Sequence, residues 1–578
     1  MSCTVGYLLR LRELMNGHRF AEATRNPEAA QAQVLADLLD RNASTAFGSE
    51  HGFAAMRGAD DYAASVPIRD YEGIRPYVRR IIFGESGVLT ADQPYVFTST
   101  SGTTGEPKLV PVTAQWREAM ASMTRLWLAN AVSDHPMCMA HKSLSIVSPA
   151  VEGHTDTGIP FGAMSGITYQ RLPNLIRRGL AVPYEVALIA DYEARYYVAM
   201  RLALAERISI IGTPNPSTLI QLGRVGAENA ESIIRAIHDG TLGIAAPIMK
   251  ATAEVSSRAA LDALRSCLRR DPARARELEQ AIGSRGRLLP CDAWPDLALI
   301  GCWLGGSVGF QAGQLATWYG DVPLRDLGFW ASEGRMTIPL TDHDAAGVLA
   351  VHENFYEFVL EDDLGREGMT PLRAHQIENG KRYYIVISAG NGLYRYDIND
   401  IVEVRGFFNA TPRIAFVRKG RDMINITGEK LHLNHIQTAL RSAEARSLIK
   451  VIQFRVIPDV PASRYDVLIE TRSTVCPANA GTFLEAFDRT LAACNVEYAG
   501  KRASRRLAPP RLHLMRPGWS QRFAAADISR GKREAQYKWQ HITQAWDELD
   551  RREALDPKAN ETPQTPGFMY DAHSGGII

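Results

Sequence analysis

The chain has 578 residues, of which 46% are hydrophobic and 22% charged, an ordinary composition for a globular protein with several domains. This composition excludes a disordered or fibrous protein, and a formal net charge of +1 gives no field that favours nucleic acid. Seven scattered cysteines without a C-x-x-C pair favour reduced thiols, and no apolar run approaches the ~20 residues of a membrane helix. We therefore expect a cytoplasmic monomer with no nucleic acid or membrane partner.

The first part of the chain combines helical and strand-like patterns. The segment Met1–Met15 is interrupted by charged residues, which predicts an amphipathic helix rather than a signal peptide. Two strand-like runs, at 95–97 and 109–112, flank a polar loop, and the periodicity of 115–132 predicts a helix. The loop is therefore expected to join two strands.

The middle of the chain predicts an α/β fold. From 180 to 300, helical stretches alternate with short apolar runs such as 208–212 and 297–302, which are typical of buried strands. From 346 to 417 the pattern becomes rich in strands. We predict a large N-terminal domain of α/β subdomains with an appended β-barrel-like sheet, for which the pattern allows either a barrel or an antiparallel sheet.

The end of the chain predicts a small second domain. The charged, glycine-containing segment 418–422 is expected to be a hinge that divides a large domain, 1–417, from a small one, 418–578. Helices at 433–445 and 482–493 and strands at 451–456 and 466–471 predict a small, mobile α+β unit.

The most informative segment is the loop Thr98–Lys108, which offers six Ser/Thr hydroxyls, two glycines and a lysine. Hydroxyls and exposed N–H groups donate to phosphate oxygens, and glycines allow the backbone to approach closely. The loop lacks the spacing of a Walker A motif and leads into a strand-like run rather than a helix. The segment therefore predicts a flap over phosphates, although a solvated turn is the ordinary structural interpretation of such a loop.

The string from Ser99 to Lys108 resembles the first signature of the adenylate-forming superfamily, and the whole chain is most similar to the GH3 family of acyl acid amido synthetases. The resemblance implies that this loop binds the β- and γ-phosphates of ATP. The loop residues assigned to the nucleotide are Ser99, Thr100, Ser101, Gly102, Thr103 and Thr104.

A second motif, Phe329 to Gly334, resembles the aromatic-x-x-[ST]-E motif of the family. The resemblance implies that Phe329 packs near adenine, that Ala331 also belongs to the nucleotide site, that Ser332 lies by the phosphates, and that Glu333 is catalytic and holds Mg²⁺. One carboxylate among phosphates is what hydrated Mg²⁺ usually takes. Phe329 stands where the family usually has tyrosine, and Trp330 where it has a small residue.

A third motif, Tyr394 to Ile401, is similar to the family's Y-R-Y-x-x-G-D-x motif, which implies that Asp400 grips the ribose hydroxyls. Asn399 replaces the family glycine. Asparagine is the residue other than glycine that most readily takes a positive φ, so the replacement is chemically mild.

The last two matching segments implicate residues after 415. Phe416 and Lys430 match nucleotide-binding positions around the hinge. The segment Gly531–Lys538 resembles the C-terminal Q-[YF]-K motif, which implies that Lys538 is the catalytic adenylation lysine, with Lys532 as the alternative. Outside this context, such lysines are ordinary surface charges.

The resemblance implies an enzyme that uses ATP and Mg²⁺ to convert a small-molecule carboxylic acid into an acyl-adenylate. Rotation of the small domain would then admit an amine, usually an amino acid, which takes the acyl group as an amide. An acyl-CoA or carrier-protein ligase of the same superfamily is the alternative. The substitutions at Phe329, Trp330 and Asn399 keep open a catalytically inactive nucleotide-binding relative.

Overall fold

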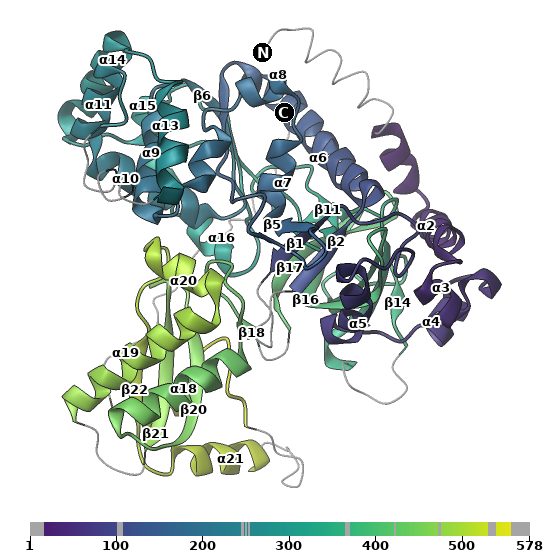
Figure 1. Ribbon diagram of the computed structural model, residues 1–578. Coiled ribbons are helices and arrows are strands. Elements are labelled where there is room, and N and C mark those ends of the chain that lie inside the picture. Colours follow the sequence, from purple (N-terminus) through teal and green to yellow (C-terminus); the bar gives the residue numbers. More distant parts are fainter. Residues whose placement is uncertain are drawn as a thin grey trace, which may run out of the picture. The chain divides into compact units, whose positions relative to one another are not determined.

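The computed structural model divides the chain into two compact units, which are described separately (Figure 1). The first unit is Met1–Asn434 with Cys494–Leu507, and the second is His435–Ala493 with Ala508–Ile578. The described residues are 17–100, 108–243, 248, 251, 255–363, 370–420, 423–471, 476–529 and 539–555. The expected helix in Met1–Met15 lies outside them.

The first unit contains a parallel sheet covered by helices, as the alternating pattern predicts (Figure 1). Its strands, in spatial order, are β3 (Lys142–Leu144), β6 (Ile208–Gly212), β7 (Leu299–Gly301) and β8 (Leu324–Arg325). The helices around it include α9 (Tyr192–Leu204), α10 (Pro216–Glu228), α11 (Ala230–Asp239), α13 (Val255–Arg265), α14 (Pro272–Ile282) and α16 (Gly306–Ala312). The inward-facing apolar residues of these elements form one continuous core.

A second sheet carries the polar loop. Strands β1 (Val96–Thr100) and β2 (Lys108–Val112) are antiparallel, with Thr100 opposite Lys108. The loop therefore joins the two strands of a hairpin, which confirms the prediction that it lies between strands. A Walker A loop, by contrast, leads into a helix. The sheet is completed by β5 (Pro160–Gly162) and β4 (Gly153–His154), and α6 (Ala114–Asp134) follows β2.

The third large sheet is antiparallel and has seven strands. In spatial order they are β11 (Thr337–Ile338), β12 (Gly347–Leu349), β17 (Thr411–Lys419), β16 (Leu393–Phe408), β15 (Arg382–Ala389), β13 (Phe355–Leu360) and β14 (Leu372–Arg373). Among the described residues, the two outer strands are not paired with each other. Of the two expected alternatives, the antiparallel sheet is observed, and the described strands form no closed barrel.

A second hydrophobic core joins this seven-stranded sheet to the N-terminal helices of the first unit. Helices α2 (Pro27–Asn42) and α5 (Tyr71–Ile82) pack with the third sheet and with α6, and Phe47, Phe97 and Tyr356 are among its fully buried residues. Two short hairpins complete the unit. They are β9 (Trp330–Ala331) with β10 (Gly334–Arg335), and β18 (Met423–Ile424) with β19 (Leu431–His432).

The second unit confirms the predicted α+β pattern. Its sheet consists of β20 (Val451–Asp459), β21 (Arg464–Thr471) and β22 (Arg511–Met515), and its helices include α18 (Leu433–Ser447), α19 (Pro477–Cys494), α21 (Trp519–Ser529) and α22 (Glu548–Glu553). Arg455 and Asp550 form a fully buried ion pair that joins β20 to α22. No helix among the described parts of either unit is long and apolar enough to cross a bilayer.

Helix α20 (Val496–Ala503) belongs by its contacts to the first unit, although its sequence neighbours on both sides belong to the second. The contact boundary at 434–435 lies beyond the expected hinge at 418–422, of which residues 421 and 422 are outside the described residues. The position of the hinge stays a prediction.

Candidate functional site

Glu333 lies at the tip of a tight hairpin. Ala331 pairs with Gly334 across β9 and β10, so Ser332 and Glu333 form a two-residue turn. The backbone carbonyl of Glu333 accepts hydrogen bonds from Trp116 Nε1 at 3.1 Å and from Asn391 Nδ2 at 3.4 Å. Glu333 is buried. The carboxylate of Glu333 therefore extends from a turn whose backbone is held by hydrogen bonds from Trp116 and Asn391.

Phe329 and Phe416, which the resemblance assigns separately to the nucleotide, lie against each other. Their rings stack with centroids 5.7 Å apart. A Cβ added at Gly306 would lie 2.8 Å from two carbons of the Phe416 ring, and Gly306 has a φ of 60°. Only glycine therefore fits beside this ring without displacement. Trp330 points elsewhere, edge-on to Trp303 with centroids 6.4 Å apart.

Asp400 lies in the third sheet, on β16, directly opposite Lys419 on β17. The two side chains form an ion pair, and Asp400 is only 2% exposed. Burial raises the pKa of Asp400, although Lys419 and Lys430 both oppose the shift. Asn399 has a φ of 56°, which confirms the predicted use of asparagine at the family's glycine position.

Arg395, in the same motif, does not face the charged residues of the site. It makes a two-pronged ion pair with Glu357, at 2.8 Å from Nε and 2.9 Å from Nη2. Its Nη1 donates to the carbonyls of Ala63 and Val66. The arginine of this motif therefore fixes the third sheet to the N-terminal helices. The sequence alone did not reveal this structural role.

Lys430 lies in the loop between β18 and β19. The neighbouring Glu429 is fully buried and accepts from the backbone N–H groups of Ile426 and Thr427, both at 2.9 Å. Burial opposes the charge of Lys430, but Glu497, Glu333 and Asp400 outweigh it and raise the pKa of Lys430. Lys430 is therefore a stabilised cation.

Lys108, at the foot of the polar loop, is the third lysine of this group. Its ammonium lies 5.5 Å from the ring centroid of Tyr71, whose hydroxyl accepts from the backbone N–H of Leu109 at 2.7 Å. Burial lowers the pKa of Lys108, while Glu333 raises it and Lys430 and Lys419 lower it further. Tyr71 thus holds the start of β2 and the lysine together.

The first unit therefore brings together charged residues from five separate stretches of sequence. We call this set the charged cluster, and it consists of Lys108, Glu333, Asp400, Lys419 and Lys430. The cluster contains three lysines and two carboxylates. Lysine ammonium groups can bind phosphate oxygens, and a carboxylate beside them can bind a metal ion that phosphates also hold. The sequence analysis missed Lys419, which only the register of β16 and β17 identifies.

Several implicated residues cannot be compared with this cluster. Ser99 lies in β1 opposite Leu109, and only the backbone of Thr100 is described. The other implicated positions lie outside the described residues, and they are Ser101, Gly102, Thr103, Thr104, Lys532 and Lys538. Their assignments stay predictions.

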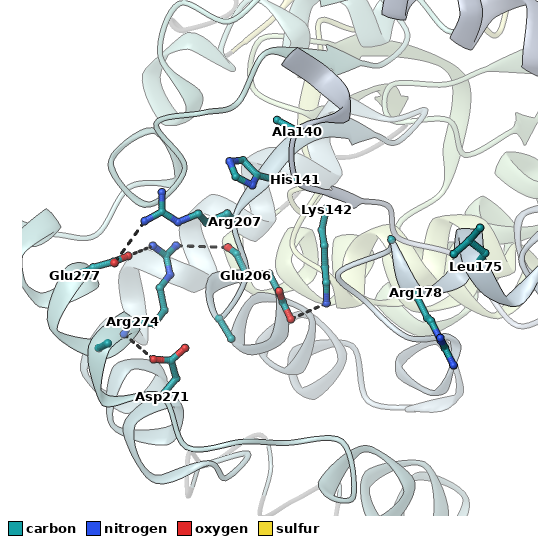
Figure 2. Close-up of a pocket in the computed structure, with 13 residues that line it drawn as sticks. Ala140, His141, Lys142, Leu175, Arg178, Glu206, Arg207, Asp271, Arg274 and Glu277 are labelled. Carbon is teal, nitrogen blue, oxygen red and sulfur yellow. Dashed lines mark hydrogen bonds and ion pairs between the residues drawn. The ribbon is translucent and has the colours of Figure 1, made fainter. Parts of the chain in front are cut away.

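A pocket of about 580 Å³ lies elsewhere in the first unit (Figure 2). Lys142, at the amino end of β3, pairs with Glu206 at 2.7 Å, and Arg274 pairs with Glu277 at 2.9 Å. Figure 2 shows Arg207 and Arg274 directed at the same Glu277 carboxylate. Ligands of open parallel sheets bind at the carboxyl ends of the strands. We therefore interpret the pocket as an ion-pair network and not as the active site.

Family models cover most of the chain. Residues 16–324 match the GH3 family N-terminal domain, 347–419 the GH3 family central domain and 434–546 the GH3 family C-terminal domain. The chain belongs to the GH3 family. Its membership confirms the resemblance that the five motifs carry.

Curated relatives align with the GH3 chain over nearly its full length. A jasmonoyl–L-amino acid synthetase of Oryza sativa subsp. japonica is 24% identical and covers 90% of this chain and 93% of its own. An indole-3-acetic acid-amido synthetase of Arabidopsis thaliana is 23% identical, with 89% of each chain covered. A solved GH3.15 acyl acid amido synthetase in complex with 2,4-DB shares the fold, with a TM-score of 0.63, 20% identity, and 94% and 96% coverage.

The donor set of this GH3 protein fits a magnesium ion held mainly by phosphates. Among the described residues, no group of three or more His, Cys, Asp or Glu side chains could hold a metal ion on its own. Mg²⁺ usually keeps several waters and takes one or two carboxylates together with substrate phosphates. Glu333, a single buried carboxylate that interacts with Lys108 and Lys430, fits that arrangement.

Proposed function

We propose that this GH3 protein activates a carboxylic acid with ATP and transfers the acyl group to an amine, most simply an amino acid, releasing AMP and pyrophosphate. The observation that carries the proposal is the charged cluster, which joins four of the GH3-like motifs in one unit. The amide-forming activities named for the relatives support the choice of an amine as acceptor.

In the first step, a carboxylate oxygen of the acid attacks the α-phosphorus of ATP. The bond from that phosphorus to the bridging oxygen breaks, and pyrophosphate leaves. Lys108 and Lys430 neutralise phosphate charge, Asp400 accepts from the ribose hydroxyls, and Phe329 and Phe416 line the base. Mg²⁺ bound at Glu333 would supply further charge neutralisation on the phosphates. Positioning and charge stabilisation account for most of such catalysis.

In the second step, the amine nitrogen attacks the acyl carbon of the adenylate. The bond from that carbon to the phosphate oxygen breaks, AMP leaves, and the nitrogen loses one proton to give a neutral amide. We propose that Lys538 serves the first step and that rotation of the small unit removes it before the second. Such conformational steps commonly limit turnover.

The proposal is tested by exchange of labelled pyrophosphate into ATP, measured over a panel of carboxylic acids. We expect exchange that depends on one class of acid and falls by roughly 100-fold or more in Glu333→Gln. The exposed Glu378, which pairs with Lys381, provides the matched control Glu378→Gln, and this variant should retain exchange. Absent exchange in the wild type would support the inactive relative, and exchange that does not depend on the acid would contradict carboxylate activation.

The acceptor is identified separately. Once the exchange assay has identified an acid that the protein activates, the protein is given this acid with ATP and either a mixture of amino acids or CoA. The products are then identified by mass spectrometry. An amide supports the proposal, whereas a thioester supports the alternative acyl-CoA ligase. Lys538→Ala and Lys532→Ala are compared in the same exchange assay. The variant that abolishes exchange identifies the adenylation lysine.

A further inference from the structure

The loop that carries Lys430 is held from inside the first unit. Gly428 has a φ of 95°, a left-handed conformation that glycine adopts without strain. The buried Glu429 carboxylate binds the Thr427 N–H and hydroxyl, the latter at 2.7 Å. Asn215, which starts α10, donates its side-chain amide to the Thr427 carbonyl. These contacts fix the loop up to Glu429, and they leave Lys430 itself to other partners.

Helix α20 supplies those partners. The backbone N–H of Lys430 donates to Glu497 Oε2 at 3.2 Å, and its backbone carbonyl accepts from Asn495 Nδ2 at 2.7 Å. Both main-chain polar groups of Lys430 are thus bound by side chains of one short segment. Asn495 also caps α20, because its Oδ1 accepts from the backbone N–H of Tyr498 at 2.8 Å. We call Asn495 and Glu497, with their two hydrogen bonds to the backbone of Lys430, the clamp. The clamp therefore lies at the start of a helix.

The charges support the same arrangement. Among the carboxylates that raise the pKa of Lys430 against burial, Glu497 has the largest effect, followed by Glu333 and Asp400. One turn along α20, Lys501 is half-buried. Burial and Arg506 lower the pKa of Lys501 to about 7, although Glu429 and Glu497 oppose the shift.

We propose that Asn495 and Glu497 are positioning residues, which hold Lys430 at the charged cluster from a segment that lies within the C-terminal family domain in sequence. This segment belongs by its contacts to the first unit, so the clamp stays with that unit wherever the second unit moves. The inference rests on the proposed function, because it requires Lys430 to contact the nucleotide. It adds residues to which none of the GH3-like motifs assigns a role.

The test is a double-mutant cycle on the full chain, with binding of a non-hydrolysable ATP analogue as the readout. We expect Lys430→Ala and Glu497→Ala each to weaken binding, by about tenfold for Glu497→Ala. In the Lys430→Ala background, Glu497→Ala should change affinity by no more than about twofold, because the backbone N–H still binds Glu497 but the lysine side chain that Glu497 positions is absent. A merely structural role of Glu497 would give additive losses.

A matched control is Glu193→Gln. Glu193 pairs with Arg505 of the same 494–507 segment at 2.9 Å, so it tests general loosening of that segment. We expect this variant to bind the analogue as the wild type does. Should Glu497→Ala not fold, Asn495→Asp enters the same cycle, because aspartate keeps the helix-capping oxygen and loses the amide that donates to Lys430.

The outcomes separate this inference from the function on which it rests. Additive losses, or an unchanged affinity in Lys430→Ala, would overturn the clamp even in a wild type that exchanges pyrophosphate. A wild type that binds the analogue without acid-dependent exchange would overturn the proposed function, while the cycle would still decide whether Glu497 acts through Lys430. A wild type that does not bind the analogue would overturn both.

Discussion

Trp116 donates a hydrogen bond from its indole Nε1 to the backbone carbonyl of Glu333, at 3.1 Å. This bond ties the first turn of α6, which directly follows the β1–β2 hairpin, to the turn that carries the second GH3-like motif. The side chain of Trp116 thus links α6 to a motif that lies 217 residues away in sequence.

We expect Trp116→Phe to lower kcat/KM for pyrophosphate exchange by roughly tenfold, because phenylalanine keeps the ring packing and loses the donor. Asn391, at 3.4 Å, is left as a weaker support for the Glu333 carbonyl. Trp294→Phe is the matched control. Trp294 is buried in the same unit and donates to the carbonyl of Glu206 at 3.2 Å. Equal losses of exchange in the two variants would contradict a specific role for Trp116.

Lys419→Met should destabilise the first unit by about 3–5 kcal/mol at neutral pH, because it leaves the buried Asp400 carboxylate without its closest cation. The pKa of Asp400, which is already raised by burial, would rise further. A raised carboxyl pKa favours the fold at low pH and loses that contribution as pH increases. The cost of Lys419→Met should therefore grow with pH in thermal unfolding curves.

The exposed Lys381 provides the control for this variant, since its ion pair with Glu378 lies at the surface. Lys381→Met should change the melting temperature little at any pH, because exposed ion pairs contribute at most about 1 kcal/mol. A loss in Lys419→Met that is independent of pH would argue that packing rather than the charge of Asp400 is responsible.

Asp326→Asn should change the pH dependence of stability. Burial raises the pKa of Asp326 to about 7, against the backbone N–H groups of Leu304 and Gly328, which both donate to its carboxylate at 2.6 Å. The unfolded value is about 3.9. This group therefore stabilises the fold below about pH 4, and that contribution is lost as pH rises through about 7.

Asparagine does not titrate and resembles the protonated acid. Relative to the wild type, Asp326→Asn should thus gain melting temperature between about pH 4 and pH 7 and show a constant difference above that range. Differential scanning fluorimetry in a series of buffers measures the effect. A difference that stays constant across the whole range would show that Asp326 has an ordinary pKa in the folded protein.

Asn399→Gly should preserve both fold and nucleotide affinity, whereas Asn399→Val should lower the melting temperature. The φ of 56° at this position is open to glycine and costs a β-branched residue about 1–3 kcal/mol. Asp400 is the next residue, so the valine variant should also bind the ATP analogue more weakly. Similar melting temperatures for the two variants would contradict the backbone argument.

Much of the fold could be predicted because its elements follow local patterns. The helix expected at 115–132 is observed as Ala114–Asp134, and the strand expected at 466–471 as Arg464–Thr471. The open edges of the seven-stranded sheet could not be predicted, because strand patterns do not encode which strands pair at the ends. A barrel and an open sheet have the same alternation of apolar and polar residues.

The site was predicted less completely. The motifs assigned Phe329 and Phe416 separately to the nucleotide, and their ring stacking became visible only in the fold. They gave no sign of Lys419 or Glu497, whose importance depends on strand register and on a helix that contacts a distant loop. Such pairings arise only from the tertiary fold. Arg395 illustrates the opposite case, since a motif position that suggests chemistry serves to bind Glu357.

The placement of α20 in the first unit has a consequence for synthesis on the ribosome. The chain crosses from one unit to the other at 434–435, 493–494 and 507–508. Residues 435–493 therefore emerge before the last piece of the first unit exists, an interval on the order of ten seconds at ordinary elongation rates. During that time the loop of Lys430 has neither Asn495 nor Glu497 to bind. Nascent chains that end before 494 should accordingly expose this loop to proteases, and chains extended well past 507 should protect it.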